Sequence, residues 1–177
     1  MRMKTFFVGA VMLIGLTGLV PSASAQDNIG GHIGFVLPLV TRANGVTTTL
    51  SDRFTIGFPI GVTFKGGSFN LDLEMVPGIT ASKDGQPQVV SLTVDPGVVC
   101  DLGGGVAAGL RVAFDVNSSQ WGFIPLLNKS WKLKNQSGFF KAWFVEADLP
   151  IKFNRPGGSG AADSTPVTFA AHFGLGF

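Results

Sequence analysis

The chain has 177 residues, a formal net charge of +2 and a single cysteine, Cys100. This length suits one domain, one cysteine excludes an intrachain disulfide framework, and a mild charge without Lys/Arg clusters argues against a nucleic-acid partner. Gly and Phe are frequent, at 25 and 16 residues, and Tyr is absent. A high apolar content spread through short segments is typical of a membrane β-barrel.

The N-terminus has the pattern of a secretory signal peptide. A short positive region is followed by an apolar run at residues 6–20 and by a small-residue cleavage site that ends at Ala25. The apolar run falls short of the ~20 residues that a spanning helix needs, which favours a cleaved signal over an uncleaved anchor. The sequence therefore predicts a signal peptide at residues 1–25, cleavage between Ala25 and Gln26, and one exported domain at residues 26–177.

After the signal, apolar residues recur at every second position, which is the period of β-strands. The strands are predicted at residues 28–40, 53–65, 68–79, 88–101, 105–117, 121–134, 139–153 and, for the C-terminal tail, 168–177. The connections alternate between short turns and longer loops, as in transmembrane barrels with periplasmic turns and outside loops. The predicted fold class is all-β, an eight-stranded antiparallel up-and-down transmembrane β-barrel, with both termini in the periplasm.

The two faces of the predicted strands differ in chemistry. A soluble barrel would turn its apolar face inward, whereas a membrane barrel turns it toward lipid. The second face carries the charges together with many glycines, which weaken an exposed strand but fit the narrow lumen of an eight-stranded barrel. We therefore predict lipid on the apolar face and a charge network in the lumen. Its members are Arg53, Asp72, Glu74, Asp95, Arg111, Asp115, Glu146, Asp148 and Lys152.

Some residues do not fit an ideal barrel. Proline in a sheet is confined to edges, strand starts and bulges, so bulges or kinks are expected at the prolines inside predicted strands. These are Pro38, Pro59, Pro96, Pro125 and Pro150. A tight turn at residues 95–97 is the alternative at one of them. Lys129 and Lys141 share the phase of the apolar face; Lys141 lies near a turn, and a bulge is expected at Lys129.

The C-terminal residues 172–177 follow the pattern polar, any residue, Gly, apolar, any residue, aromatic. This pattern resembles the assembly signal of bacterial outer-membrane β-barrel proteins. The resemblance implies recognition by the barrel-assembly machinery and a location in the outer membrane of a Gram-negative bacterium. The positions that carry it are His172, Gly174, Leu175 and Phe177. The size is similar to the small eight-stranded barrels of the OmpA and OmpX type, although Trp and Phe must replace the usual Tyr of the aromatic girdles.

The chain has two histidines, His32 and His172, both on the predicted inward face of the strands that close the barrel. We therefore expect them to lie close together. A serine acyl-transfer site needs a serine, a histidine base and an acid, but no His-x-Ser pair accompanies either histidine. Because buried charges need partners, the carboxylates are interpreted as ion-pair partners. No catalytic residue, metal site or cofactor is predicted.

The predicted role is structural or surface interaction by a monomer with a side-chain-filled lumen and outer-membrane lipid as its surroundings. Two alternatives stay open. One is a lipid-modifying enzyme of the lipid A deacylase or acyltransferase type, and the other is porin-like, narrow-channel transport of a small solute.

Overall fold

The computed structural model of the protein describes residues 28–118, 120–135, 138–154 and 165–177. The predicted signal peptide and the cleavage site between Ala25 and Gln26 lie outside these residues. Within the described ranges, no helix is long and apolar enough to cross a membrane.

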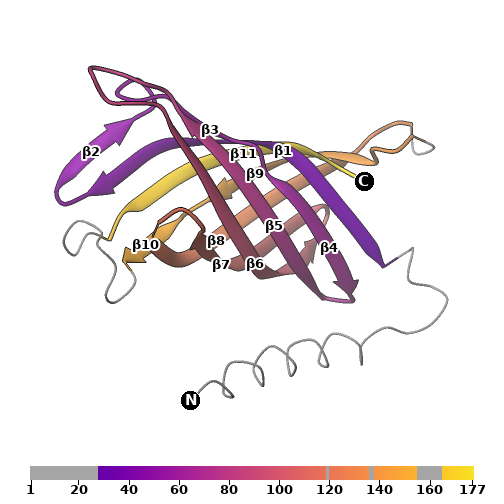
Figure 1. Ribbon diagram of the computed structural model, residues 1–177. Helices are drawn as coiled ribbons and strands as arrows, with labels where there is room; N and C mark the ends of the chain where they lie inside the picture. Colours follow the sequence, from indigo (N-terminus) through magenta and orange to yellow (C-terminus); the bar gives the residue numbers. More distant parts are fainter. Residues whose placement is uncertain (1–27, 119, 136–137, 155–164) are drawn as a thin grey trace, which may run out of the picture.

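The described residues form strand segments that close into a single antiparallel barrel (Figure 1). The segments are β1 (Ile29–Ala43), β2 (Val46–Thr49), β3 (Thr55–Gly57), β4 (Ile60–Gly66), β5 (Phe69–Thr80), β6 (Val89–Gly103), β7 (Val106–Asp115), β8 (Gln120–Lys132), β9 (Ala142–Asp148), β10 (Ile151–Asn154) and β11 (Val167–Gly176). In this part of the chain β3 and β4 form one barrel strand, as do β9 and β10, and β2 extends β1 as a hairpin, so the barrel has eight strands. The predicted all-β, eight-stranded antiparallel barrel is confirmed.

The barrel closes where the last strand, β11, pairs with the first, β1, in a register that places His32 opposite Gly176. Phe177 extends this ladder, because its backbone N–H donates to Gly31 at 2.9 Å and its carbonyl accepts from the Gly31 N–H at 3.1 Å. The Phe177 ring lies against Gly31, where a β-carbon would collide with it. It also stacks on Phe139 with ring centroids 4.8 Å apart. The C-terminal residue is therefore part of the seam.

Three of the five prolines interrupt the sheet as expected. Pro59 lies between β3 and β4, and Pro150 lies between β9 and β10. The register between β1 and β11 shifts between Pro38 and Val40. Proline has no N–H to donate to a ladder, so the neighbouring strand cannot pair evenly at these points.

At the other two prolines the register does not shift, so no bulge is found there. β6 runs through Pro96, which lies opposite Leu73, and β8 runs through Pro125, which lies opposite Leu110. The alternative turn at residues 95–97 is wrong. In the described ladders each of these prolines has a Cα partner in one neighbouring strand and none in the other. The missing N–H thus interrupts one ladder and leaves the other in register.

Lys129 needs no bulge, and that expectation is wrong as well. The register between β7 and β8 is regular at this point, and Lys129 lies opposite Val106, the first residue after a short turn. Its Nζ atom donates to the Gly104 carbonyl at 2.6 Å and lies 5.5 Å from the centroid of the Trp131 ring. A lysine at the end of a barrel strand can direct its ammonium group toward the polar turn.

Two longer connections are built on tight hairpin turns. Asn44 and Gly45 both have positive φ, at 50° and 78°, and join β1 to β2. Asp84 and Gly85, at 49° and 78°, form the turn between β5 and β6. Asn-Gly and Asp-Gly pairs are preferred in type I′ hairpin turns because these need positive φ at both central residues.

A hydrogen bond network stabilises the end of the β2 hairpin. The backbone N–H of Thr49 donates to the Asp52 carboxylate at 2.7 Å, and the Thr49 hydroxyl donates to it at 2.8 Å. These bonds favour the ionised carboxylate and hold the pKa of Asp52 below its ordinary value.

The two faces of the barrel wall have opposite chemistry to those of a soluble protein. Large apolar side chains point outward and are exposed, including Ile33, Phe35, Phe58, Ile60, Val62, Phe64, Leu71, Leu73, Met75, Val98, Leu110, Leu127, Trp143 and Phe169. Charged and polar side chains point inward and are buried, including Asp72, Glu74, Asp95, Arg111, Glu146, Asp148 and His172. Charged residues are almost never fully buried unless they are paired, so these charged side chains are expected to have partners within the lumen.

Candidate functional site

Arg111 extends from β7 to the centre of the lumen, and its side chain is 3% exposed. Its Nε donates to Asp72 at 2.9 Å and its Nη1 donates to Glu146 at 2.8 Å. Its Nη2 lies 3.5 Å from Glu74, and its Nη1 lies 3.9 Å from Asp148. The guanidinium fork can serve several carboxylates at once. We call Arg111 and these four carboxylates, with the two histidines, the central cluster.

The period of the strands explains why these residues meet. Asp72 and Glu74 are two positions apart on β5, so both point inward. Glu146 and Asp148 have the same spacing on β9, on the other side of the lumen. Opposite Arg111 on β6 stands Gly97, where a β-carbon would lie 2.6 Å from Arg111 Cγ. The glycine makes room for the long arginine side chain.

The two histidines belong to the same cluster, and the expectation that they lie close together is confirmed. Their ring centroids are 5.7 Å apart. His32 Nε2 is 2.6 Å from a Glu74 oxygen, and His172 Nδ1 is 3.3 Å from a Glu146 oxygen. Phe144 contacts both rings edge-on, with centroid distances of 5.6 Å and 4.9 Å. Each histidine is therefore oriented by one carboxylate and one aromatic ring.

A second ion pair lies nearer the long loops. Lys152 on β10 donates to both oxygens of Asp115 on β7, at 2.7 Å and 2.9 Å. The Thr93 hydroxyl on β6 donates to the same carboxylate at 2.7 Å. Two of the three N–H donors of the Lys152 ammonium group are therefore used on the Asp115 carboxylate.

The structure brings most, but not all, residues of the predicted lumen network together. Asp95 is buried in the lumen at 2% exposure, yet in the described part of the chain its Oδ1 atom has no hydrogen-bond partner. Arg53 is not brought to the other charges. It precedes β3 at the loop end, where its Nε donates to the Ala81 carbonyl at 3.3 Å and its Nη2 to the Pro87 carbonyl at 2.8 Å.

Two neutral hydrogen-bond donors to the central cluster were not among the predicted residues. Asn128 Nδ2 donates to Glu146 at 3.0 Å, and the Thr63 hydroxyl donates to Asp72 at 2.7 Å. Both lie on the inward face by the same two-residue period. The two-residue period therefore gives the face on which these residues lie. The residue type gives no such signal, because threonine and asparagine are also common on protein surfaces.

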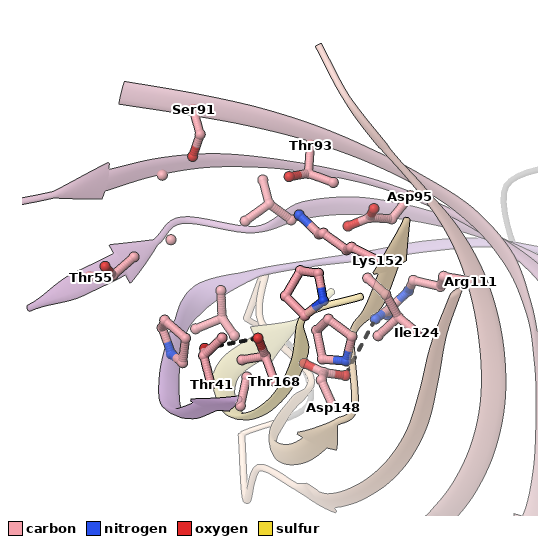
Figure 2. A pocket seen from close by; sticks show the side chains of 18 of the residues that line it. Thr41, Thr55, Ser91, Thr93, Asp95, Arg111, Ile124, Asp148, Lys152 and Thr168 are labelled. Carbon is pink, nitrogen blue, oxygen red and sulfur yellow. Dashed lines mark hydrogen bonds and ion pairs between the residues drawn. The ribbon is translucent and has the colours of Figure 1, made fainter. Parts of the chain in front are cut away.

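The central cluster lies between two cavities of the described barrel. The loop-side cavity has a volume of about 330 Å³ and includes Asp95, Asp148 and Lys152 in its lining (Figure 2). The turn-side cavity has a volume of about 160 Å³ and includes His32 and Glu146. Arg111 lines both cavities. The Arg111 side chain with its carboxylates thus forms the partition between them.

Donor atoms in the cluster are close enough to suggest metal ligands, but a guanidinium already lies among them. His32, Glu74 and His172 form one such group, and Glu146 and Asp148 with His172 form another, with donor atoms within 4.8 Å of one another. Arg111 contacts a carboxylate of each group, at 3.5 Å and 2.8 Å. The guanidinium supplies the positive charge that a metal ion would supply, so these carboxylates have a cationic neighbour without a metal ion.

The cluster also lacks the arrangement of a serine acyl-transfer site. Such a site needs a hydroxyl hydrogen-bonded to a histidine base. Within the described ranges, the hydrogen bonds of both histidine rings go to carboxylates, and His172 Nε2 has no partner. No family model, curated protein or solved structure matches the chain. The function is therefore argued from the barrel itself.

We expect Gly61→Ala to destabilise the protein, because a β-carbon at this position would collide with the His32 ring and push it from Glu74. Overpacking of this kind costs about 1–3 kcal/mol. Gly176→Ala is the matched control, since its β-carbon would meet its nearest atom at 3.7 Å, an ordinary contact. The measurement is unfolding by guanidinium in detergent micelles, followed by tryptophan fluorescence. Equal loss of stability in both variants would contradict the role of Gly61.

Proposed function

We propose that the protein is a transmembrane β-barrel of the bacterial outer membrane, a monomer with a closed lumen and a structural or surface-interaction role. The observation that carries the proposal is the inverted wall, apolar outside and charged inside. Monomeric soluble proteins rarely expose apolar patches larger than a few hundred Å². A closed barrel in lipid needs such a surface, and it leaves no strand edge with unsatisfied backbone groups.

The strand lengths support the same proposal. β5, β6, β7 and β8 have 12, 15, 10 and 13 residues. A tilted strand needs about 9–11 residues to cross the hydrocarbon core of a bilayer. Each of these strands is therefore long enough to span it.

Aromatic side chains lie at both ends of the wall. Near the short turns, Trp131 stacks on Trp143 with ring centroids 4.2 Å apart. Toward the long loops, Trp121 contacts Phe123 and Phe153, each at 5.5 Å. Transmembrane barrels carry girdles of aromatic residues at the two membrane interfaces. Trp and Phe can form these girdles here without Tyr.

The C-terminal tail supports the location in the outer membrane. Its resemblance to the barrel-assembly signal rests on His172, Gly174, Leu175 and Phe177, and Phe177 lies at the seam of the barrel. An assembly factor that recognises this strand would therefore act on the strand that closes the barrel. Together with the predicted signal peptide, this favours the small outer-membrane barrels of the OmpA and OmpX type.

The central cluster supports a structural role over a pore. Arg111 connects Asp72 on β5 with Glu146 on β9, which are on different sides of the lumen. Small eight-stranded barrels have an interior just wide enough for side chains to fill. The buried ion pairs fill the middle of this one.

A direct test combines gel migration with conductance. We expect the folded protein in dodecyl sulfate to migrate differently before and after boiling, because a closed barrel resists the detergent until it is heated. In planar lipid bilayers we expect no stepwise conductance above that of the lipid alone. A protein that stays soluble without detergent after removal of residues 1–25 would overturn the membrane proposal. Stepwise conductance would overturn the closed lumen.

A further inference from the structure

The loop-side cavity has two chemically different ends. Figure 2 shows Thr55 and Ser91 toward one end and Asp95, Arg111 and Asp148 toward the other. Its volume of about 330 Å³ lies within the range of small-molecule sites. Its lining also includes the apolar residues Val36, Val76, Ile124 and Ala170.

Two carboxylates at the inner end have unused acceptor atoms. Asp95 is 2% exposed and Asp148 is 6% exposed. Among the described residues the Oδ1 atom of each has no hydrogen-bond partner. Burying an unpaired carboxylate oxygen is costly, and each such group in a folded protein needs an explanation. Both residues line the cavity, so a bound group there could supply the missing donor.

The two cations that line the cavity make their shortest hydrogen bonds to carboxylates outside its lining, and the Arg111 guanidinium also lies 3.5 Å from Glu74 and 3.9 Å from Asp148. Lys152 donates to Asp115, which does not line the cavity, at 2.7 Å and 2.9 Å. The two short hydrogen bonds of Arg111 go to Asp72 and Glu146, which also lie outside the cavity lining. The three carboxylates that do line it are Glu74, Asp95 and Asp148. The inner end is therefore acidic, and it would repel an anionic ligand.

We propose that this cavity binds a small organic cation. The ammonium group of the ligand lies at the acidic end, where Asp95 and Asp148 accept its hydrogen bonds, and its apolar body packs against Val36, Val76 and Ile124. The hydroxyl groups of Thr55 and Ser91 at the other end can accept a polar substituent. This binding goes beyond the proposed structural role, and it does not depend on whether the lumen conducts.

The first test compares ligands of one shape and different charge on the wild-type protein. Benzylammonium chloride, benzyl alcohol and sodium benzoate are titrated calorimetrically into the folded protein in uncharged detergent micelles. We expect benzylammonium to bind and benzyl alcohol to bind at least about tenfold more weakly, because a hydrogen bond to a charged group is stronger than one between neutral groups. Benzoate should not bind. No binding of benzylammonium, or equal binding of the alcohol, would overturn the proposal.

The second test assigns the binding to the cavity. Asp95→Asn and Asp148→Asn keep the side-chain shape and replace one carboxyl oxygen acceptor with an amide donor, and each is expected to weaken benzylammonium binding about tenfold. Asp101→Asn is the matched control, because Asp101 is exposed and accepts from Gly103 N–H at a turn. The Asp101→Asn variant should bind benzylammonium with the affinity of the wild type. Full affinity in both cavity variants would overturn the site.

The proposal can be decided even if one cavity variant does not fold. Gel migration before and after boiling shows whether each variant is folded, and if a cavity variant does not fold, the comparison of ligands on the wild type still decides. A failure of amine binding would leave the membrane proposal untouched, since that proposal is tested by gel migration and by solubility without detergent.

Discussion

Arg111→Met is expected to lower the free energy of unfolding by about 3–5 kcal/mol, which is the usual cost of removing one partner from a buried ion pair. Methionine matches the arginine side chain as far as its Nε atom and so keeps the packing of the apolar stem. It leaves Asp72 and Glu146 without the donors that now lie at 2.9 Å and 2.8 Å. It also removes the guanidinium group that lies 3.5 Å from Glu74 and 3.9 Å from Asp148. Guanidinium unfolding in detergent micelles measures the difference in the free energy of unfolding between the variant and the wild type.

Two further variants make this result specific. Arg111→Lys keeps the charge but loses the fork that serves Asp72 and Glu146 together, so we expect an intermediate loss of about 1–3 kcal/mol. Arg42→Met makes the same change at an exposed position of the β1–β2 hairpin and should stay within about 0.5 kcal/mol of the wild type. If Arg111→Met were as stable as Arg42→Met, the central cluster would not stabilise the barrel.

Leu73→Arg is expected to destabilise the protein in phospholipid vesicles by about 2–4 kcal/mol, the cost of an arginine near the bilayer midplane on the lipid face of a barrel. Leu73 is 45% exposed on the outward face and lies in the middle part of β5. On a soluble barrel an arginine at such an exposed position would change stability by less than about 0.5 kcal/mol. Urea or guanidinium unfolding from vesicles measures the difference.

The control uses the same strand and the same outward face. Phe69 is the first residue of β5, at the short-turn end, and is 64% exposed. There an arginine reaches the interface, and Phe69→Arg is expected to cost about 0–1 kcal/mol. A depth-dependent difference between the two variants supports a bilayer around the wall. Equal effects at both positions would contradict it.

Side-chain alternation is sufficient to predict the barrel wall. On β5 the alternation of Leu71 and Leu73 with Asp72 and Glu74 assigns both faces, and the structure places the leucines outside and the carboxylates inside. The two-residue period is a local property of the strand. It needs no knowledge of neighbouring strands, and for this reason the faces and the strand number can be predicted from one sequence.

Which charged side chains meet in the lumen depends on the stagger of neighbouring strands. The alternation of side chains along one strand gives no information about this stagger. The inward face of β7 predicts that Arg111 is buried, but which carboxylates it meets depends on the registers of β5 and β9. Arg53 shows the converse. It continues the alternation of the predicted strand at residues 53–65, yet β3 begins at Thr55 and Arg53 bonds to loop carbonyls instead.

The prolines show a similar limit. A proline disturbs a ladder only on the side where its N–H would have donated, and that side depends on the register. Pro59 and Pro150 interrupt their strands, whereas Pro96 and Pro125 do not. In contrast, the Asn44-Gly45 turn has a purely local signal, and a closer inspection of the sequence could have predicted that hairpin.

The seam between β1 and β11 has a consequence for the order of assembly. In the described barrel it is the one pairing that joins distant parts of the chain, since all other pairings join neighbours in sequence. The hydroxyl bond between Thr41 and Thr168 joins residues 127 positions apart. Closing so long a loop costs more conformational entropy than closing a hairpin. The wall can therefore form hairpin by hairpin, and the barrel closes only when β11 pairs with β1.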